Sequence, residues 1–244
     1  MSGLVHAELL KLVTTRLLLW LGLLIVGLEL LVISLEISQD SVVSLAETRQ
    51  QRSVVAIAGV SALISLILGI VSSAGEYAHG TISHTFLVAP VRERVVAAKL
   101  VATAACGAAL AVCSGAFAWG YAALLLSARS VPVHLGSGSV VRVLLGAIAA
   151  AAITGALGVG FGGLVRRQTA AVVVALVWLL VGEPLLGIAG IQSYAPGHAI
   201  ASVVEAGTQG PDLLGFWGGL AVALLYAAGF AGAGTVLVNR ADVS

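Results

Sequence analysis

Six apolar runs, each about as long as a helix needs to cross a bilayer, constrain this chain more than any other feature. A hydrocarbon core about 30 Å thick is crossed by about 20 helical residues. Runs of that kind lie at about 17–35, 54–75, 100–126, 143–165, 170–191 and 213–238. Because backbone polar groups in lipid must be paired within the protein, we expect an all-α integral membrane protein with six transmembrane helices, forming a single domain over residues 1–244.

The composition agrees with a membrane location. Hydrophobic residues make up 59% of the 244 positions, charged residues make up 9%, and the mean hydropathy is +1.09. Soluble domains are about half apolar and about one-quarter charged, so the composition excludes a soluble globular fold. The net charge is +1 and lysine occurs only at Lys11 and Lys99, which leaves no polyanion-binding surface. Nucleic acid is therefore not an expected partner, whereas membrane lipid is.

Basic residues predict how the six spans are oriented. An even number of spans places both termini on one side of the membrane. Eight basic residues fall on that side and four on the other: Lys11, Arg16, Arg92, Arg94, Lys99, Arg166, Arg167 and Arg240, against Arg49, Arg52, Arg129 and Arg142. Since cytoplasmic loops carry the excess of Lys and Arg, we expect cytoplasmic termini and a location in the cell (inner) membrane.

Residues 1–15, before the first span, place apolar and polar side chains at roughly helical spacing. Leu9 and Leu12 are set against Glu8 and Lys11. This pattern predicts an amphipathic helix that lies in the membrane interface. A frayed tail is the alternative.

The longest polar segment between spans, residues 76–99, has apolar and charged faces of its own. Gly80 permits a sharp turn, Phe86 belongs to a short apolar face, and Pro90 interrupts the chain before the third span. A loop of about 24 residues is longer than a simple connection needs, so we expect a helix–turn–helix that docks on a soluble protein. A loop that anchors only on lipid headgroups is the alternative.

The chain lacks the residues of a self-contained motor or enzyme. Neither lysine follows a glycine, as the Gly-Lys-Ser/Thr of a phosphate-binding loop requires. Every Asp and His lies outside the predicted spans, which leaves intramembrane proteases without their catalytic groups. Cys106 and Cys113, in one span, are too far apart along a straight helix to bridge. We therefore expect no catalytic residue, metal or cofactor in this chain by itself.

Two acidic residues lie inside predicted spans, Glu29 in the first and Glu183 in the fifth. Both stand about 18–20 Å from the cytoplasmic end of their helix, at 1.5 Å per residue. A carboxylate at that depth is costly unless it is protonated, paired or hydrated, so both residues are candidates for a translocation path. The alternative is that one or both reach the outer interface or cap a kink at Pro184.

The order of motifs along the chain is a further source of information. An acidic residue at the membrane surface, a Gly-Thr pair, a proline and basic residues leading to a lysine follow one another as Glu76, Gly80, Thr81, Pro90, Arg92, Arg94 and Lys99. An N-terminal helix with Glu8 and Lys11, six spans and a segment containing Pro196 before the last span accompany them. In this order and spacing the whole chain resembles ABC-2-type transporter permeases.

That resemblance implies a half-size permease, paired with a second permease subunit (an identical or a related chain) and with ATP-binding cassette ATPase subunits. ATP and Mg²⁺ would bind to the ATPase and not to this chain. The loop after the second span would be a coupling helix, in which Glu76 pairs with a nearby basic group. The residues implied in ATPase coupling are Glu76, Tyr77, His79, Gly80, Thr81, Phe86, Pro90, Arg92, Arg94, Arg166 and Arg167.

The expected function is therefore the transmembrane subunit of an ATP-driven exporter for an amphipathic small molecule, peptide or lipid. A non-transporting scaffold or sensor that recruits a regulatory protein through residues 76–99 is a rival. A membrane enzyme with Glu29 and Glu183 as acid and base is another, although no nucleophile or metal ligand accompanies them. The three differ in what accompanies the chain out of its native membrane: an ATPase, a regulator, or nothing.

Overall fold

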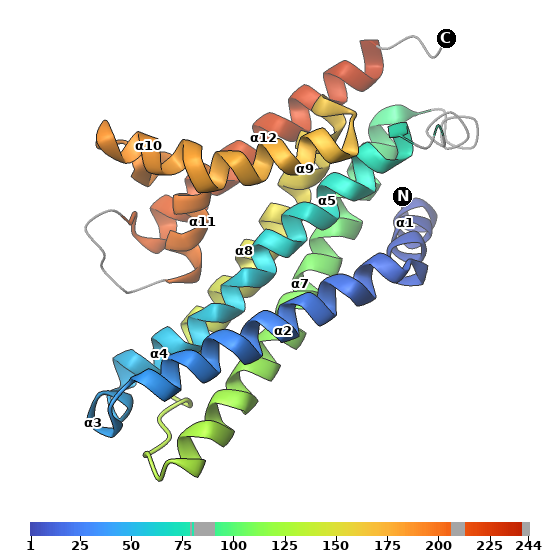
Figure 1. The fold of residues 1–244 in the computed structure, drawn as a ribbon. Coiled ribbons are helices and arrows are strands. Elements are labelled where there is room, and N and C mark those ends of the chain that lie inside the picture. The colour runs from blue at the N-terminus through green and yellow to red at the C-terminus, as the bar shows by residue number, and fades with distance from the viewer. Residues whose placement is uncertain (79, 81–90, 206–212, 241–244) are drawn as a thin grey trace.

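The computed structural model describes residues 1–78, 80, 91–205 and 213–240, and this part of the chain is helical with no strand (Figure 1). Its helical segments long and apolar enough to cross a membrane are Arg16–Gln39, Thr48–Ala78, Arg92–Ala128, Gly138–Val165, Gln168–Ile188 and Phe216–Leu237. The expected all-helical class and the expected six spans are confirmed. The chain has the character of a multi-pass membrane protein.

The elements in chain order are α1 (Ser2–Thr14), α2 (Arg16–Gln39), α3 (Val42–Leu45), α4 (Thr48–Ala56), η1 (Ile57–Gly59), α5 (Val60–Ala78), α7 (Arg92–Ala128), α8 (Gly138–Val165), α9 (Gln168–Val177), η2 (Trp178–Gly182), α10 (Glu183–Ile188), η3 (Gln192–Tyr194), α11 (Pro196–Val204) and α12 (Phe216–Arg240). The third span begins earlier than its apolar run, because Arg92, Glu93 and Arg94 already belong to α7. Arg and Glu are good helix formers, so α7 can include these charged residues ahead of its apolar run.

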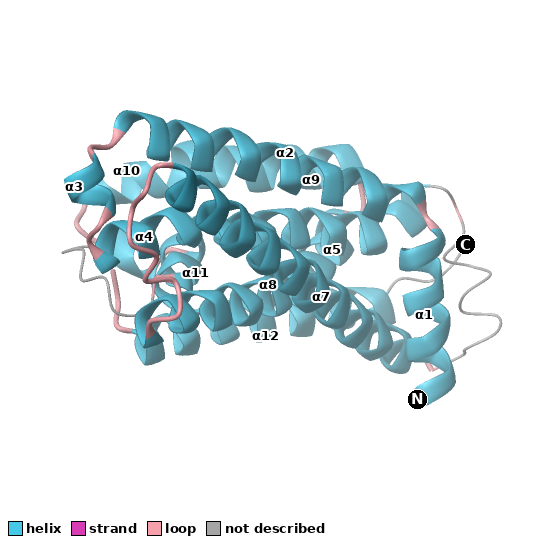
Figure 2. Cartoon of the chain, turned by 90° about the horizontal axis from the view of Figure 1, so that it is seen from below, coloured by secondary structure: helices cyan, strands magenta, loops and turns pink. Residues whose placement is uncertain are grey.

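The bundle has two ends that differ in what they carry. One end, here called the α1 end, holds α1, the end of α5 and the end of α12 (Figures 1 and 2). The opposite end, here called the α11 end, holds α3, α4, α10 and α11. α1 and the end of α12 thus share one side, as an even number of spans requires. That this side is cytoplasmic stays a prediction from the basic residues.

Glycines allow α8 to approach its neighbours closely. A Cβ on Gly158 would clash with the carbonyl oxygen of Leu66 in α5 and would stand 2.9 Å from the amide nitrogen of Ile70. A Cβ on Gly160 would lie 2.6 Å from the backbone of Phe230 in α12. Lipid tails are as apolar as leucine, so in a membrane such close backbone contact replaces the hydrophobic effect as the main attraction between helices.

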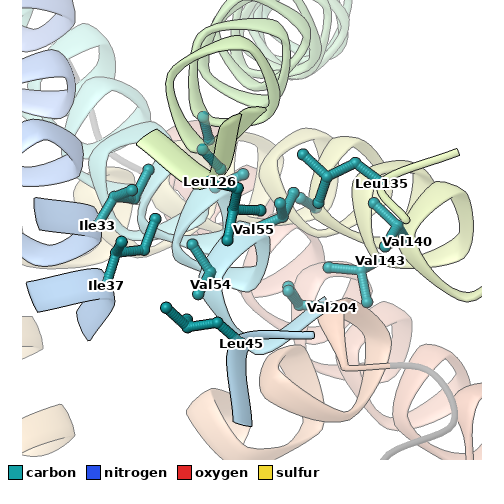
Figure 3. Packing of buried hydrophobic residues seen from close by; sticks show 14 of the residues in the cluster. Ile33, Ile37, Leu45, Val54, Val55, Leu126, Leu135, Val140, Val143 and Val204 are labelled. Carbon is teal, nitrogen blue, oxygen red and sulfur yellow. The ribbon is translucent and has the colours of Figure 1, made fainter. Parts of the chain in front are cut away.

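The α11 end has an apolar core built from many elements. Side chains of α2, α3, α4, α7, α8, α11 and the 129–137 connection meet there, among them Ile33, Leu45, Leu126 and Val204 (Figure 3). Within it lies Gln51, which is fully buried. Its amide donates to the carbonyl oxygens of Leu45 (2.9 Å) and Pro132 (2.7 Å), and it accepts from the His134 amide (2.7 Å). One side chain therefore ties two connecting segments together.

α1 packs on the bundle through Glu8 and Leu12, its two buried residues. The structure differs from the predicted amphipathic pattern at Glu8, which is expected on the polar face and is buried. The helix is present, and its position in a membrane interface stays a prediction. Burial of Glu8 has a specific cause, which is the ion cluster described below.

Two spans contain irregular turns. The second span passes through a 3-10 turn at η1, and the fifth widens into a π-helix at η2, where the amide of Glu183 donates to the carbonyl oxygen of Trp178. Pro184 follows this turn and has no N–H to donate, so it cannot continue the regular ladder. Irregular turns inside helices are frequently found at functional positions.

We predict that Gly158→Ala and Gly229→Ala have opposite effects on thermal stability. Gly229 lies in α12 with open space around its Cα, so alanine should be neutral or stabilising there, by up to about 1 kcal/mol of helix propensity. At Gly158 the same methyl group meets α5 backbone, and overpacking of this kind costs about 1–3 kcal/mol. Unfolding of the purified protein in detergent, followed by tryptophan fluorescence, measures both. Equal midpoints would contradict this account of the α5–α8 contact.

Candidate functional site

Four charged side chains form a closed ion cluster at the α1 end. Lys99, two turns into α7, places its Nζ 2.7 Å from Glu8 Oε2 and 2.7 Å from Glu76 Oε1. Lys11 completes the ring, with Nζ 2.7 Å from Glu8 Oε1 and 3.0 Å from Glu76 Oε1. Glu8 and Lys11 stand three residues apart on one face of α1, and Glu76 lies in the last turn of α5, so the cluster joins three helices.

The cluster is unevenly buried. The side chain of Lys99 is 4% exposed and that of Glu8 is 7% exposed, whereas that of Lys11 is 49% exposed. Removing charges from water costs several kcal/mol per ion, so a buried pair is not itself proof of stability. Its main consequence is specificity: each carboxylate here is matched by an ammonium group, and α1 can dock only where both Glu8 and Lys11 find their partners.

The cluster shifts the pKa values of its members in α1. Burial by itself raises the pKa of Glu8, but the charge of Lys99 and the hydrogen bonds from both lysines outweigh it and leave that pKa below its ordinary value. Burial by itself lowers the pKa of Lys11, but hydrogen bonds to Glu8 and Glu76 outweigh it and raise that pKa. Both shifts favour the charged forms, so the ion pairs persist through neutral pH.

Arg166 makes a second polar junction at the same end. It ends α8 in the left-handed conformation, with φ 56°. Its guanidinium lies 5.3 Å from the ring centre of Tyr77, at the end of α5, and donates to the carbonyl oxygen of Leu237 in α12 at 2.9 Å. The Arg166 guanidinium therefore covers the Tyr77 ring. Arg167, which follows Arg166, is exposed.

The other residues predicted to couple to an ATPase are distributed around these two junctions. Arg92 and the exposed Arg94 begin α7. Gly80 has φ 66°, a conformation that favours glycine, and its amide donates to the carbonyl oxygen of Tyr77 at 3.3 Å. The remaining ones, His79, Thr81, Phe86 and Pro90, lie outside the described residues, as does the predicted coupling helix.

An apolar cavity of about 540 Å³ lies deeper in the bundle. Its walls come from η1, α5, α8, α9, η2, α11 and α12 and are almost wholly hydrocarbon. The hydroxyls of Thr154 and Tyr226 on the wall already donate, to the carbonyl oxygens of Ala62 (2.7 Å) and Tyr194 (3.2 Å). A volume of about 300–1,000 Å³ is typical of sites that bury a small molecule.

Glu29 and Glu183 do not line this cavity. Glu183 is buried and caps the start of α11, accepting from the amides of Gly197 (2.6 Å) and His198 (3.1 Å), and its Oε2 lies 3.0 Å from His198 Nδ1. A carboxylate is favourable there because helix N-termini carry unpaired N–H groups. Glu29 bonds instead to Ser114 of α7. The structure therefore does not bring the two acids together around this cavity.

The sequence did not reveal the roles of four residues at these sites. Lys99 belongs to the permease-like motif and to the basic residues that predict orientation, but its place in the sequence does not indicate a buried ammonium group. Ser114 is one serine in a long apolar helix and carries no pattern. The N–H groups of Gly197 and His198 belong to the backbone, although Pro196 ahead of them was a clue to a helix start.

Comparisons with known proteins add no assignment. No protein-family model matches the chain, and no curated protein sequence matches it. Among the described residues, no group of three or more His, Cys, Asp and Glu side chains is placed to hold a metal ion. Functional inference therefore rests on the residues and their geometry.

We predict that the two lysines of the cluster contribute very differently to stability. Lys99→Met leaves Glu8 and Glu76 buried with half of their compensating charge, and breaking a buried pair costs about 3–5 kcal/mol. Lys11→Met is the matched control, because exposed ion pairs contribute about 0–1 kcal/mol. Thermal unfolding in detergent gives both values. Similar losses for the two variants would contradict the burial argument.

The pKa shift of Glu8 predicts how acid affects α1. A lowered pKa in the folded state means that the Glu8 contribution is fully present above the ordinary value of 4.5 and is lost as pH falls through the folded value. The raised pKa of Lys11 acts in the opposite range: its contribution is present below 10.5 and is lost as pH rises through the folded value.

The measurement is the unfolding midpoint of the wild type minus that of Glu8→Gln, from about pH 3 to about pH 9. The difference should be constant near neutral pH and shrink below pH 4.5, the ordinary Glu value. Glu47→Gln, which removes an exposed carboxylate outside the cluster, should not reproduce that shrinkage. A difference that grows in acid would show that Glu8 is not held as an anion.

Proposed function

We propose that this chain is the transmembrane permease subunit of an ATP-driven exporter that moves amphipathic molecules. One observation carries the proposal: α5 bears the ion cluster at its end and supplies a wall of the apolar cavity further along. Leu66 lines the cavity and Glu76 belongs to the cluster. Ten residues separate them in the sequence, which is about 15 Å along a helix.

A force applied at the α1 end would therefore reach the cavity. α1 and α7 are fastened to α5 by ion pairs, so the three helix ends move together at that end. A helix transmits axial and tilting displacement along its length, and α5 is in close backbone contact with α8. Movement of the cluster would thus change the α5 wall relative to the α8 wall, which alternating access requires.

The energy would come from a separate ATP-binding cassette ATPase. The sequence has no phosphate-binding loop of its own. The described residues 76–78 and 91–99 and the turn at Arg167 belong to the α1 end, where α5 ends, α7 begins and α8 gives way to α9. Exposed Arg94 and Arg167 offer positive charge to an acidic surface on such a partner. ATP and Mg²⁺ would bind to that partner.

The cavity supports an amphipathic cargo with a substantial hydrocarbon part. Glu29 bonds to Ser114 and Glu183 bonds to the Gly197 amide, so the expectation that these acids line a translocation path gains no support. Val174 and Trp178 lie on the cavity wall and are 51% and 44% exposed. A molecule dissolved in the bilayer could therefore enter sideways, past the fifth span.

A second permease subunit completes the proposal. The first, fifth and sixth spans have few buried side chains in the single chain. Lipid can cover such faces, and so can another copy or a related permease chain. The proposed assembly pairs two permease chains with two ATPases.

We predict that charge reversal at the α1 end separates this chain from its ATPase. The tagged chain, solubilised from its native membrane, should carry a stoichiometric ATP-binding cassette protein identified by mass spectrometry. Arg167→Glu should reduce that recovery severalfold, since like charges at an interface repel. Arg49→Glu, which changes another exposed arginine but at the α11 end, is the matched control and should leave recovery unchanged.

The possible outcomes discriminate between the rival functions. Recovery of a kinase or another regulatory protein in place of an ATPase would favour the scaffold. A solitary chain would remove the basis for an ATP-driven transporter. Loss of the ATPase with Arg49→Glu but not with Arg167→Glu would place the contact at the wrong end and contradict the proposed coupling surface.

A further inference from the structure

Glu29 is a fully buried acid with a single hydrogen-bond partner. It lies in α2, about 20 Å from the start of that helix at 1.5 Å per residue, and its exposure is 0%. Its Oε1 is 2.5 Å from the hydroxyl oxygen of Ser114 in α7. Its Oε2 is buried and has no hydrogen-bond partner among the described residues. An ionised carboxylate offers about four acceptor positions, so this environment satisfies only a small part of that demand.

No compensating positive charge faces Glu29 from the helices packed around it. α2 is uncharged from Leu17 to Leu35 apart from Glu29, and the second span is uncharged from Ser53 to Gly75. α7 is uncharged from Leu100 to Ala128. The flanking charged groups are Arg16 and Glu36 on α2, Arg52 and Glu76 on the second span, and Lys99 on α7, with Arg129 just beyond it.

The other titratable groups on these helices are engaged or turned away. Tyr121 of α7 pairs with Ser34 of α2 at 2.8 Å, further toward the α11 end. Cys113 is exposed and Cys106 lies about two turns from Ser114. A bare carboxylate would thus remain uncompensated in a medium of low dielectric constant, which costs far more than taking up a proton.

We propose that Glu29 and Ser114 form a proton-binding site within the membrane, occupied whenever α2 is packed against α7. The bound proton lies on Oε1 and is donated to the Ser114 hydroxyl. Ser114 in turn donates to the carbonyl oxygen of Ala58, 3.4 Å away in η1. Oε2 is then the carbonyl oxygen of a neutral acid, for which a missing hydrogen bond costs much less than for an anion.

The surroundings suit a proton better than a metal cation. Metal cations that prefer oxygen ligands, such as Mg²⁺ and Ca²⁺, are coordinated by about six or more oxygen atoms. Around Glu29 the nearby hydroxyl and carbonyl oxygens are already paired with one another: Ser61 donates to the Ala58 carbonyl at 2.6 Å, and Ser114 bridges Ala58 and Glu29. A proton needs one oxygen to carry it and a second oxygen to accept its hydrogen bond. Glu29 Oε1 and the Ser114 hydroxyl provide these two oxygens.

Occupancy of this site is linked to the position of α2. While α2 covers α7 and η1, the acid is dry and keeps its proton. If α2 moves away and water reaches Glu29, the carboxylate gains solvation, and the proton passes to water. The site would therefore release one proton each time this interface opens, whatever the chain transports. Proton release at Glu29 does not depend on the ATPase proposed above.

Infrared spectroscopy of the purified protein in lipid nanodiscs tests the proposal directly. At about pH 7, where an exposed Glu is ionised, the wild type should show the carbonyl-stretch band of a protonated carboxylic acid, and deuteration should shift it. Glu29→Gln should remove that band and keep the fold, since an amide is neutral and of similar shape. Glu47→Gln, at an exposed position, should leave the band unchanged.

A second variant keeps the test decisive if Glu29→Gln does not fold. Ser114→Ala retains the acid but removes its hydrogen-bond partner, so the band should persist at a higher frequency. Absence of the band in wild type, or a band unaffected by both Glu29→Gln and Ser114→Ala, would overturn the proposal. A change of the Glu29 band from the protonated-acid form to the carboxylate form when sodium replaces choline in the buffer would also overturn the proposal. It would indicate a site for a metal cation.

Discussion

Close backbone contact around α8 is the constraint on which the rest of this structure depends. Between lipid-facing helices there is little hydrophobic force to bring surfaces together, so attraction has to come from van der Waals contact at short range. Gly158 and Gly160 provide it toward α5 and α12. With α5 and α8 held in this way, the end of α5 lies beside α7, where the ion cluster forms. The same two helices provide two walls of the apolar cavity.

Charge is arranged in this molecule according to what water can reach. At the α1 end, where water is near, carboxylates and lysines pair as ions, and Lys11 remains half exposed. Deeper in the bundle, each buried acid has a different kind of hydrogen-bond partner. Glu183 uses the N–H groups of a helix start, while Glu29 has only one hydroxyl beside it. Glu29 and Glu183 are both buried but have different partners, and those partners determine what each acid can do.

The sequence was sufficient for the spans and insufficient for the contacts between them. Long apolar runs are properties of one segment, and this is why six helices could be predicted. Contacts such as Lys99 with Glu8 join residues far apart in the chain, and no periodicity reports them. Equal depth makes Glu29 and Glu183 candidates for one translocation path, but depth does not determine the direction in which a side chain leaves its helix.

The π-helix at η2 has a consequence for how this chain tolerates change. One extra residue is accommodated in that turn, so every residue after it is rotated by about 100° relative to a regular helix. Glu183 follows this turn directly and accepts from the Gly197 amide at the start of α11. Deleting a single residue between Trp178 and Gly182 would turn this stretch into a regular α-helix and leave the direction of Glu183 unchanged, whereas closing the π-turn without a deletion would rotate the acid by about 100° away from α11.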